Sequence, residues 1–225
     1  MKTLLVTMML LLATLSAFPQ GKVTFGNDST RLFQFGDVLA ADSAYAGQPI
    51  PESPLPSGLW LQAVLYAGMT ASQMTLQTSV VLAGANWLTP GRMVNKSMTL
   101  TGVPGGSPAY FKVLWLDTRG TLPTTIDGNA WFLSGFWNFR YLAASELFTA
   151  VPGTSISYPL LWDTTGPASS TWQSGSIRNG MIPEPASNVM VGLGLVLLFV
   201  LRRCAASTPA SSNEVTTERG MEHVE

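Results

Sequence analysis

The chain has 225 residues, of which 11% are charged, and its formal net charge is −1. Residues 21–182 carry eight basic and eight acidic side chains, and this balance excludes the basic stripe that a nucleic-acid partner requires. The single cysteine, Cys204, and the single histidine, His223, both lie outside this body. The body therefore forms no disulfide, has no Ser-His-Asp triad and offers no histidine metal ligand, and we expect no cofactor.

The N-terminus has the layout of a secretory signal peptide. Lys2 supplies a positive charge, residues 4–15 form an apolar run, and Ala17 is a small residue where cleavage is expected. An uncleaved membrane helix is the alternative, but the run is short for a bilayer and Pro19 ends it. We therefore expect residues 1–20 to be a signal peptide, with export through the Sec translocon and removal by signal peptidase.

The body is punctuated by Gly, Pro, Ser and Thr at short intervals and shows little helical periodicity, which favours many short strands. Residues 42–57 are expected to form a Pro-rich loop, and "YLAASELF" at 141–148 leaves a short helix as an alternative. Repeated short strands predict a mainly β fold, a single antiparallel β-sandwich or jelly-roll-like domain over residues 21–181. The expected strands are 22–26, 31–35, 58–67, 98–102, 109–117, 145–151 and 156–162.

The segment "VPGGSP" predicts a β-hairpin between strands 98–102 and 109–117. Pro104 presets a turn, and Gly105 and Gly106 accept a positive φ.

The strand 109–117 predicts a buried face by its alternation. Phe111, Val113 and Trp115 share one face, which should point inward. Trp60 also lies within an apolar run, so we expect Trp60 and Trp115 to pack in the core.

The stretch "NAWFLSGFWNFRY" at 129–141 is the preferred binding surface, because so many aromatic side chains are hard to bury together. Trp131, Trp137 and Tyr141 are the predicted glycan-binding residues, since exposed rings offer flat apolar platforms to sugars. Packing in the core is the alternative for any of them.

Paired carboxylates remain a possible catalytic constellation, because glycoside hydrolysis needs only two Asp or Glu groups about 5–9 Å apart. Turn and loop roles are the competing interpretation of these side chains. The candidates are Glu52, Asp117, Asp127, Glu146 and Asp163.

A second hydrophobic run lies near the C-terminus. Pro185 keeps the residue before it out of the helical region, so the Pro-Glu-Pro step at 183–185 is expected to be extended. Residues 189–201 are uncharged and would form a transmembrane helix of roughly 20 Å, short against a hydrocarbon core of about 30 Å. A buried core helix is the alternative, but the run has no polar face. The basic pair at 202–203 should stay cytoplasmic, which leaves the body outside.

This arrangement resembles the PEP-CTERM sorting signal of Gram-negative bacteria that make exopolysaccharide. The resemblance covers residues 182–203 and implies tethering in the inner membrane until an exosortase, a membrane cysteine transpeptidase, processes the chain near Pro-Glu-Pro. The body is also similar to short secreted members through "VTFGN" at 23–27 and "LYAG" at 65–68. Members usually end near the basic cluster, whereas here a polar tail at 204–225 follows, which we expect to be disordered and cytoplasmic. The sorting-motif residues are Pro183, Glu184, Pro185, Arg202 and Arg203.

Together these features predict a non-enzymatic exported protein of the cell surface or extracellular matrix. After a membrane-tethered stage, its expected location is the cell envelope or the medium. A carbohydrate-binding module for exopolysaccharide is the first alternative, and a glycan-active hydrolase is the second.

Overall fold

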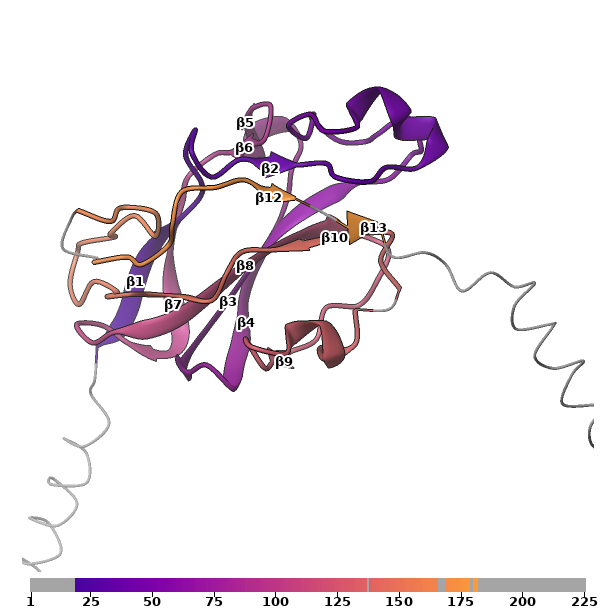
Figure 1. The fold of residues 1–225 in the computed structure, drawn as a ribbon. Helices are drawn as coiled ribbons and strands as arrows, with labels where there is room; N and C mark the ends of the chain where they lie inside the picture. Colours follow the sequence, from indigo (N-terminus) through magenta and orange to yellow (C-terminus); the bar gives the residue numbers. More distant parts are fainter. Residues whose placement is uncertain (1–18, 137, 166–168, 179, 182–225) are drawn as a thin grey trace, which may run out of the picture. The chain divides into compact units, whose positions relative to one another are not determined.

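The fold is described from a computed structural model, which covers residues 19–136, 138–165, 169–178 and 180–181 (Figure 1). Its short 3-10 helices are η1 (Ala40–Tyr45), η2 (Gly84–Asn86) and η3 (Trp131–Ser134). The strands are β1 (Gln20–Phe25), β2 (Phe33–Gln34), β3 (Leu61–Thr70), β4 (Gln73–Val81), β5 (Trp87–Thr89), β6 (Arg92–Met93), β7 (Lys96–Pro104), β8 (Ala109–Asp117), β9 (Thr125–Ile126), β10 (Tyr141–Ala144), β11 (Phe148–Ala150), β12 (Ile177–Arg178) and β13 (Gly180–Met181).

The main element of the fold is a seven-stranded antiparallel sheet in the order β13-β10-β8-β3-β4-β9. The seventh strand, β11, pairs with the same edge of β8 as β10 does. Three two-stranded pairs accompany it: β1 with β7, β5 with β6, and β2 with β12, of which the last is parallel. The expectation of a mainly β fold is confirmed.

The larger hydrophobic core lies on one face of this sheet. As predicted, Phe111, Val113 and Trp115 of β8 all point into it and are fully buried. Side chains of β1, β2, β7 and β12 close the same core, for example Phe25 and Phe33. Burial of such large side chains supplies the main driving force for folding.

The opposite face of β8 is buried as well, which the alternation did not predict. Leu114 and Leu116 pack with Tyr66, Phe136 and Phe139 in a second, smaller cluster. The chain between β8 and β10 folds back over the sheet and covers this face (Figure 1). A strand that is apolar on both faces suits the centre of a sheet, where β8 lies.

The predicted hairpin between β7 and β8 does not form. β7 pairs with β1, and β8 pairs with β3, β10 and β11, so both of its edges are occupied. The "VPGGSP" segment carries the chain from one sheet to the other instead, and Gly106 has a φ of +81°. Turn residues fix how the chain bends, whereas strand pairing depends on which edges are open.

The structure also answers two further predictions, for residues 141–148 and for residues 156–162. Residues 141–148 form β10 and the start of β11, not a helix, because β8 offers them an open edge. The expected strand at 156–162 is replaced by a loop that contacts β1 through a parallel bridge between Leu160 and Thr24 and through a hydrogen bond from the Thr24 hydroxyl to the Tyr158 carbonyl at 2.9 Å. That loop lies beside β1 in Figure 1, where it is drawn in orange.

The Gln77 side chain joins β4 of the seven-stranded sheet to β7 of the β1–β7 pair. Gln77 of β4 accepts the Thr101 N–H at 2.7 Å and donates to the Thr101 carbonyl at 3.2 Å. An amide side chain can pair with a strand edge in this way because it carries one donor group and one acceptor. Gln77 thereby occupies backbone groups of β7 that another strand would otherwise bind.

The two predicted hydrophobic ends fall largely beyond the described residues. Most of the predicted signal peptide, the helix at 189–201 and the tail at 204–225 lie outside them. Within the described part of the chain, no helix has the length and hydrophobicity needed to cross a membrane.

Candidate functional site

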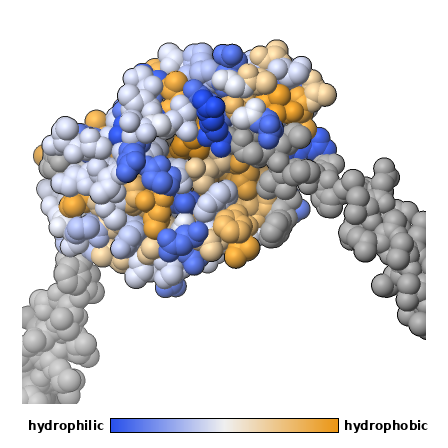
Figure 2. Space-filling model, in the orientation of Figure 1, coloured by the Kyte–Doolittle hydropathy of each residue, from blue (hydrophilic) through white to orange (hydrophobic). Residues whose placement is uncertain are grey.

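The predicted aromatic surface at 129–141 is not a single surface. Trp131 is half-buried in η3, where its ring meets Phe136 edge-on at 5.8 Å. Trp137 lies outside the described residues. The exposed hydrophobic side chains of η3 are instead Phe132 and Leu133, 52% and 64% exposed, and Figure 2 shows hydrophobic surface in that region.

The prediction that Tyr141 binds a glycan is wrong, because its ring is fully buried in the larger core. Its hydroxyl donates to Asp42 Oδ2 at 2.8 Å and accepts the Leu39 N–H at 2.8 Å. Asp42, itself buried, also accepts the Ser57 N–H at 2.9 Å. Tyr141 therefore ties the loop before β3 to β10 and offers no ring to a ligand.

The buried tyrosines predict alkaline sensitivity. Burial raises the pKa of Tyr66 and of Tyr141, and nearby Asp42 adds to the effect at Tyr141. A tyrosine in the unfolded chain ionises near pH 10 while these two stay protonated, so stability should fall as pH rises above about 10. The expected loss is at most about 1.4 kcal/mol per pH unit for each tyrosine.

Urea midpoints measured between pH 8 and pH 11.5 check this expectation. Tyr141→Phe should reduce the decline above pH 10, whereas the surface variant Tyr158→Phe should leave it unchanged. A decline of equal steepness in both variants would contradict the assignment.

The second tryptophan prediction, for Trp60 and Trp115, is half right. Trp115 is fully buried and its Nε1 donates to the Ile177 carbonyl at 3.1 Å. Trp60 is 46% exposed, because it precedes β3 instead of lying inside the strand.

The candidate carboxylates are held by turns and strand ends. Asp127 accepts the Asn129 N–H at 2.9 Å, and Asp163 accepts the Thr165 N–H at 2.9 Å, both two residues along the chain. Glu52 accepts the Gly84 N–H at 2.6 Å. Asp127 and Asp163 therefore have the turn roles that the sequence offered as the competing interpretation, and Glu52 joins its loop to the start of η2.

The other two candidates also serve the fold. Asp117 is fully buried and accepts N–H groups from Arg119, Arg140 and Tyr141. Glu146 accepts the Gln173 N–H at 2.8 Å. Among the described residues, no three acidic, histidine or cysteine side chains form a cluster fit to hold a metal ion.

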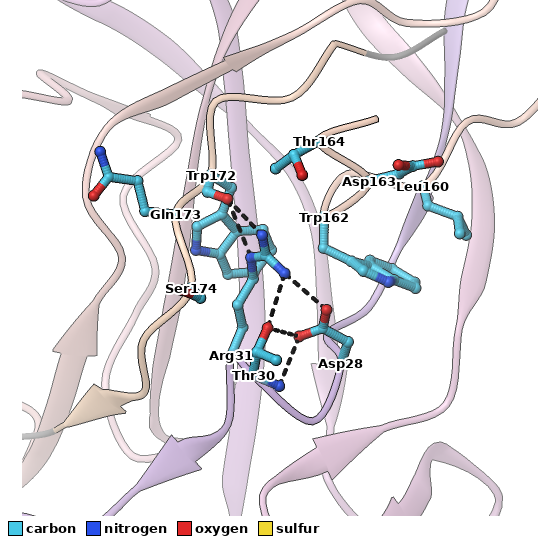
Figure 3. Close-up of a pocket in the computed structure, with 10 residues that line it drawn as sticks. All are labelled: Asp28, Thr30, Arg31, Leu160, Trp162, Asp163, Thr164, Trp172, Gln173 and Ser174. Atoms are coloured by element: carbon cyan, nitrogen blue, oxygen red, sulfur yellow. Dashed lines mark hydrogen bonds and ion pairs between the residues drawn. The ribbon is translucent and has the colours of Figure 1, made fainter. Parts of the chain in front are cut away.

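A hollow of about 460 Å³ lies where the turn after β1 meets the C-terminal loops (Figure 3). Asp28 and Arg31 line it from the N-terminal side, and Trp162 and Asp163 from the loop that follows β11. Its volume falls in the range of about 300–1,000 Å³ that is typical of ligand sites. Sequence reasoning singled out Asp163 as a candidate carboxylate but did not group it with the others, because the lining residues come from three separate segments.

The floor of this hollow is the end of an aromatic column. Phe111 stacks on Phe148 with ring centroids 5.8 Å apart, and Phe148 stacks on Trp172 at 4.8 Å. The Arg31 guanidinium lies over the Trp172 ring, 5.6 Å from the ring centroid. The column connects the centre of the large sheet to the hollow, so the site has a rigid base.

Arg31 is buried, and most of its donors are in use. Nε and Nη2 donate to the Trp172 carbonyl at 3.2 and 2.6 Å, and Nη1 donates to Asp28 Oδ2 at 2.7 Å and to Thr30 Oγ1 at 3.1 Å (Figure 3). The guanidinium has five N–H groups, so four contacts nearly saturate it. Asp28 neutralises its charge, and Arg31 therefore acts as a structural clamp.

The "VTFGN" segment supports one wall of the hollow, because its Gly26 packs against Trp162. A Cβ on Gly26 would lie 3.0 and 3.1 Å from two carbons of the Trp162 ring, so the glycine lets this ring pack directly on the backbone. Trp162 is half-buried there and packs against the larger core. The remainder of its ring lines the hollow.

Asn27, the last residue of that segment, fixes the turn that carries Asp28 and Arg31. Its Nδ2 donates to the carbonyls of Arg31 and Gly91 at 2.8 and 2.7 Å, and its Oδ1 accepts the Met93 N–H at 3.0 Å. A buried amide that makes three hydrogen bonds holds its loop in one geometry.

One unusual cation lies away from the hollow, on the outer face of β8. Lys112 is buried and its Nζ lies 5.8 Å from the centre of the Trp131 ring. Burial lowers the pKa of Lys112, and the negative charge of Glu146 opposes that shift. Its position under η3 makes it part of the packing of that segment.

No family model matches the chain, and neither a curated protein nor a solved structure is similar to it.

Proposed function

We propose that the protein is a non-enzymatic, exported β module that an exosortase sorts to the cell surface or the extracellular matrix. The single observation that carries this proposal is the ordered set of signals in the sequence, from the N-terminal apolar run to Pro-Glu-Pro, a short hydrophobic run and paired arginines. The partners are the Sec translocon, signal peptidase and exosortase, with the inner membrane as a transient tether.

The described domain is compatible with this path. Its strands run from Gln20 to Met181, so they begin after Ala17, the small residue where cleavage is expected, and end before Pro183; Gln20 alone overlaps the signal peptide predicted over residues 1–20. The fold is stabilised by an apolar core without disulfides. The layers on either side of that core support the finer assignment to a β-sandwich or jelly-roll-like domain.

Processing of the C-terminus tests the proposal. Mass spectrometry of the protein recovered from the producing cell's surface and medium should find a new C-terminus between residues 183 and 186. Replacing Pro183 and Pro185 with alanine should abolish that end and keep the chain in the membrane fraction, because the extended recognition segment is lost. Exported protein that retains its tail through Glu225 would contradict sorting.

A second candidate function, carbohydrate binding, is favoured by one specific observation. The hollow beside Trp162 combines an accessible aromatic ring with carboxylate, amide and hydroxyl side chains. It takes the place of the surface around Trp131 and Tyr141 as the candidate sugar site. The glycan-active hydrolase is not favoured, because the candidate carboxylates already serve turns and strand ends.

A further inference from the structure

We infer that the hollow beside Trp162 binds a neutral, hydroxyl-rich saccharide chain and discriminates against polyuronates. This inference deepens the second candidate function and rests on it. It adds the place of the site and the charge class of the ligand.

The platform is the Trp162 ring. Its inner part packs on Gly26 and the larger core, so it is held in place before any ligand arrives. The rest of the ring faces the hollow. A ring that is fixed by packing loses little conformational freedom on binding, which favours contact with the apolar face of a sugar.

The charges in the hollow select against anions. One guanidinium and two carboxylates line it, which gives a formal charge of −1. Arg31 donates to Asp28 and to the Trp172 carbonyl, so its charge is already neutralised. The lining thus holds one carboxylate more than it holds cations, and the carboxylates of a polyuronate would meet repulsion.

Hydroxyl groups suit the same lining. A carboxylate accepts up to about four hydrogen bonds, and three donors from Thr30 and Arg31 approach Asp28. On the rim, the exposed side chains of Thr164 and Gln173 add a hydroxyl and an amide, which both donate and accept. Vicinal sugar hydroxyls can pair with such groups without bringing a charge.

The rim is exposed on both the Thr164 and the Gln173 sides, so the hollow suits a segment of a longer polymer. A site that encloses one small molecule would bury these side chains.

The test uses the full-length chain in mild detergent and affinity gel electrophoresis. The neutral polymers are dextran, laminarin and galactomannan, and the polyuronates are alginate and polygalacturonate. At least one neutral polymer should retard the protein more strongly than either polyuronate. Trp162→Ala should weaken that retardation about tenfold or more, as for a tryptophan at the centre of a contact.

Two further variants keep the test clear of folding effects. Gln173→Ala changes an exposed side chain and should weaken binding several-fold with an unaltered urea midpoint. Trp60→Ala removes an exposed tryptophan that does not line the hollow, and it should bind like the wild type.

Three results would overturn the inference. Stronger retardation by a polyuronate would refute the charge argument, and loss of binding in Trp131→Ala but not in Trp162→Ala would move the site to η3; in both cases carbohydrate binding itself survives. Retardation by none of the five polymers would remove both the inference and the candidate function. The C-terminal mass measurement is independent of all three.

Discussion

Trp172→Ala is expected to lower the free energy of unfolding by about 3–5 kcal/mol, the usual cost of removing a large buried aromatic side chain. Trp172 is fully buried and contacts both Phe148 and Arg31, so its loss opens a cavity at the end of the column. The surrounding strands cannot collapse into that space, because β11 is held to β8 by its own backbone pairing.

Trp172→Phe should cost much less, and the reason is specific to this site. The Trp172 Nε1 is buried and has no hydrogen-bond partner among the described residues. Replacing the indole with a phenyl ring therefore removes an unsatisfied polar group, which offsets part of the lost packing.

Trp115→Phe is the matched control, because the same change is made at an equally buried tryptophan. Trp115 Nε1 donates to the Ile177 carbonyl, so this variant leaves the carbonyl without its partner. It should be less stable than Trp172→Phe by about 1 kcal/mol. Urea denaturation of the three variants measures the differences, and equal stability of the two phenylalanine variants would contradict the explanation.

Asp117→Ala is expected to destabilise the domain by about 3–5 kcal/mol, because it removes the acceptor for several buried donors at once. Asp117 accepts the backbone N–H groups of Arg140 and Tyr141 at 2.6 and 2.9 Å, and that of Arg119 at 3.1 Å. These bonds fix the start of β10 against the end of β8.

The ion pair between Asp117 and Arg119 contributes little to this effect. The Arg119 side chain is 37% exposed, and such pairs contribute roughly 0–1 kcal/mol. Arg119→Met should therefore be nearly neutral. Asp127→Ala is the second control: it removes a carboxylate that caps one exposed turn and should cost about 1 kcal/mol or less.

Thermal or urea unfolding of the three variants separates the backbone role of Asp117 from its charge. If Arg119→Met were as destabilising as Asp117→Ala, the ion pair would be the important interaction, and the acceptor role would be wrong.

The sequence predicted the inner face of β8 and the β class because both follow from local alternation and turn residues. It did not predict that β7 pairs with β1, since "VPGGSP" bends the chain equally well for a hairpin or for a crossing between sheets. The same limit applies to Tyr141. Its ring can be buried because Asp42 accepts a hydrogen bond from its hydroxyl, and Asp42 lies 99 residues earlier in the chain.

The sequence by itself predicted the mainly β fold, because strand alternation and turn residues act over a few residues. The order of the proposed sorting signals likewise follows from local features: an apolar run, Pro-Glu-Pro, a second apolar run and a basic pair. Only the tertiary structure decided the candidate site. Asp28, Trp162 and Gln173 come from separate segments, and long-range pairing of those segments brings them to one hollow. Local sequence patterns do not indicate which distant segments come into contact, so the hollow could not be predicted from the sequence.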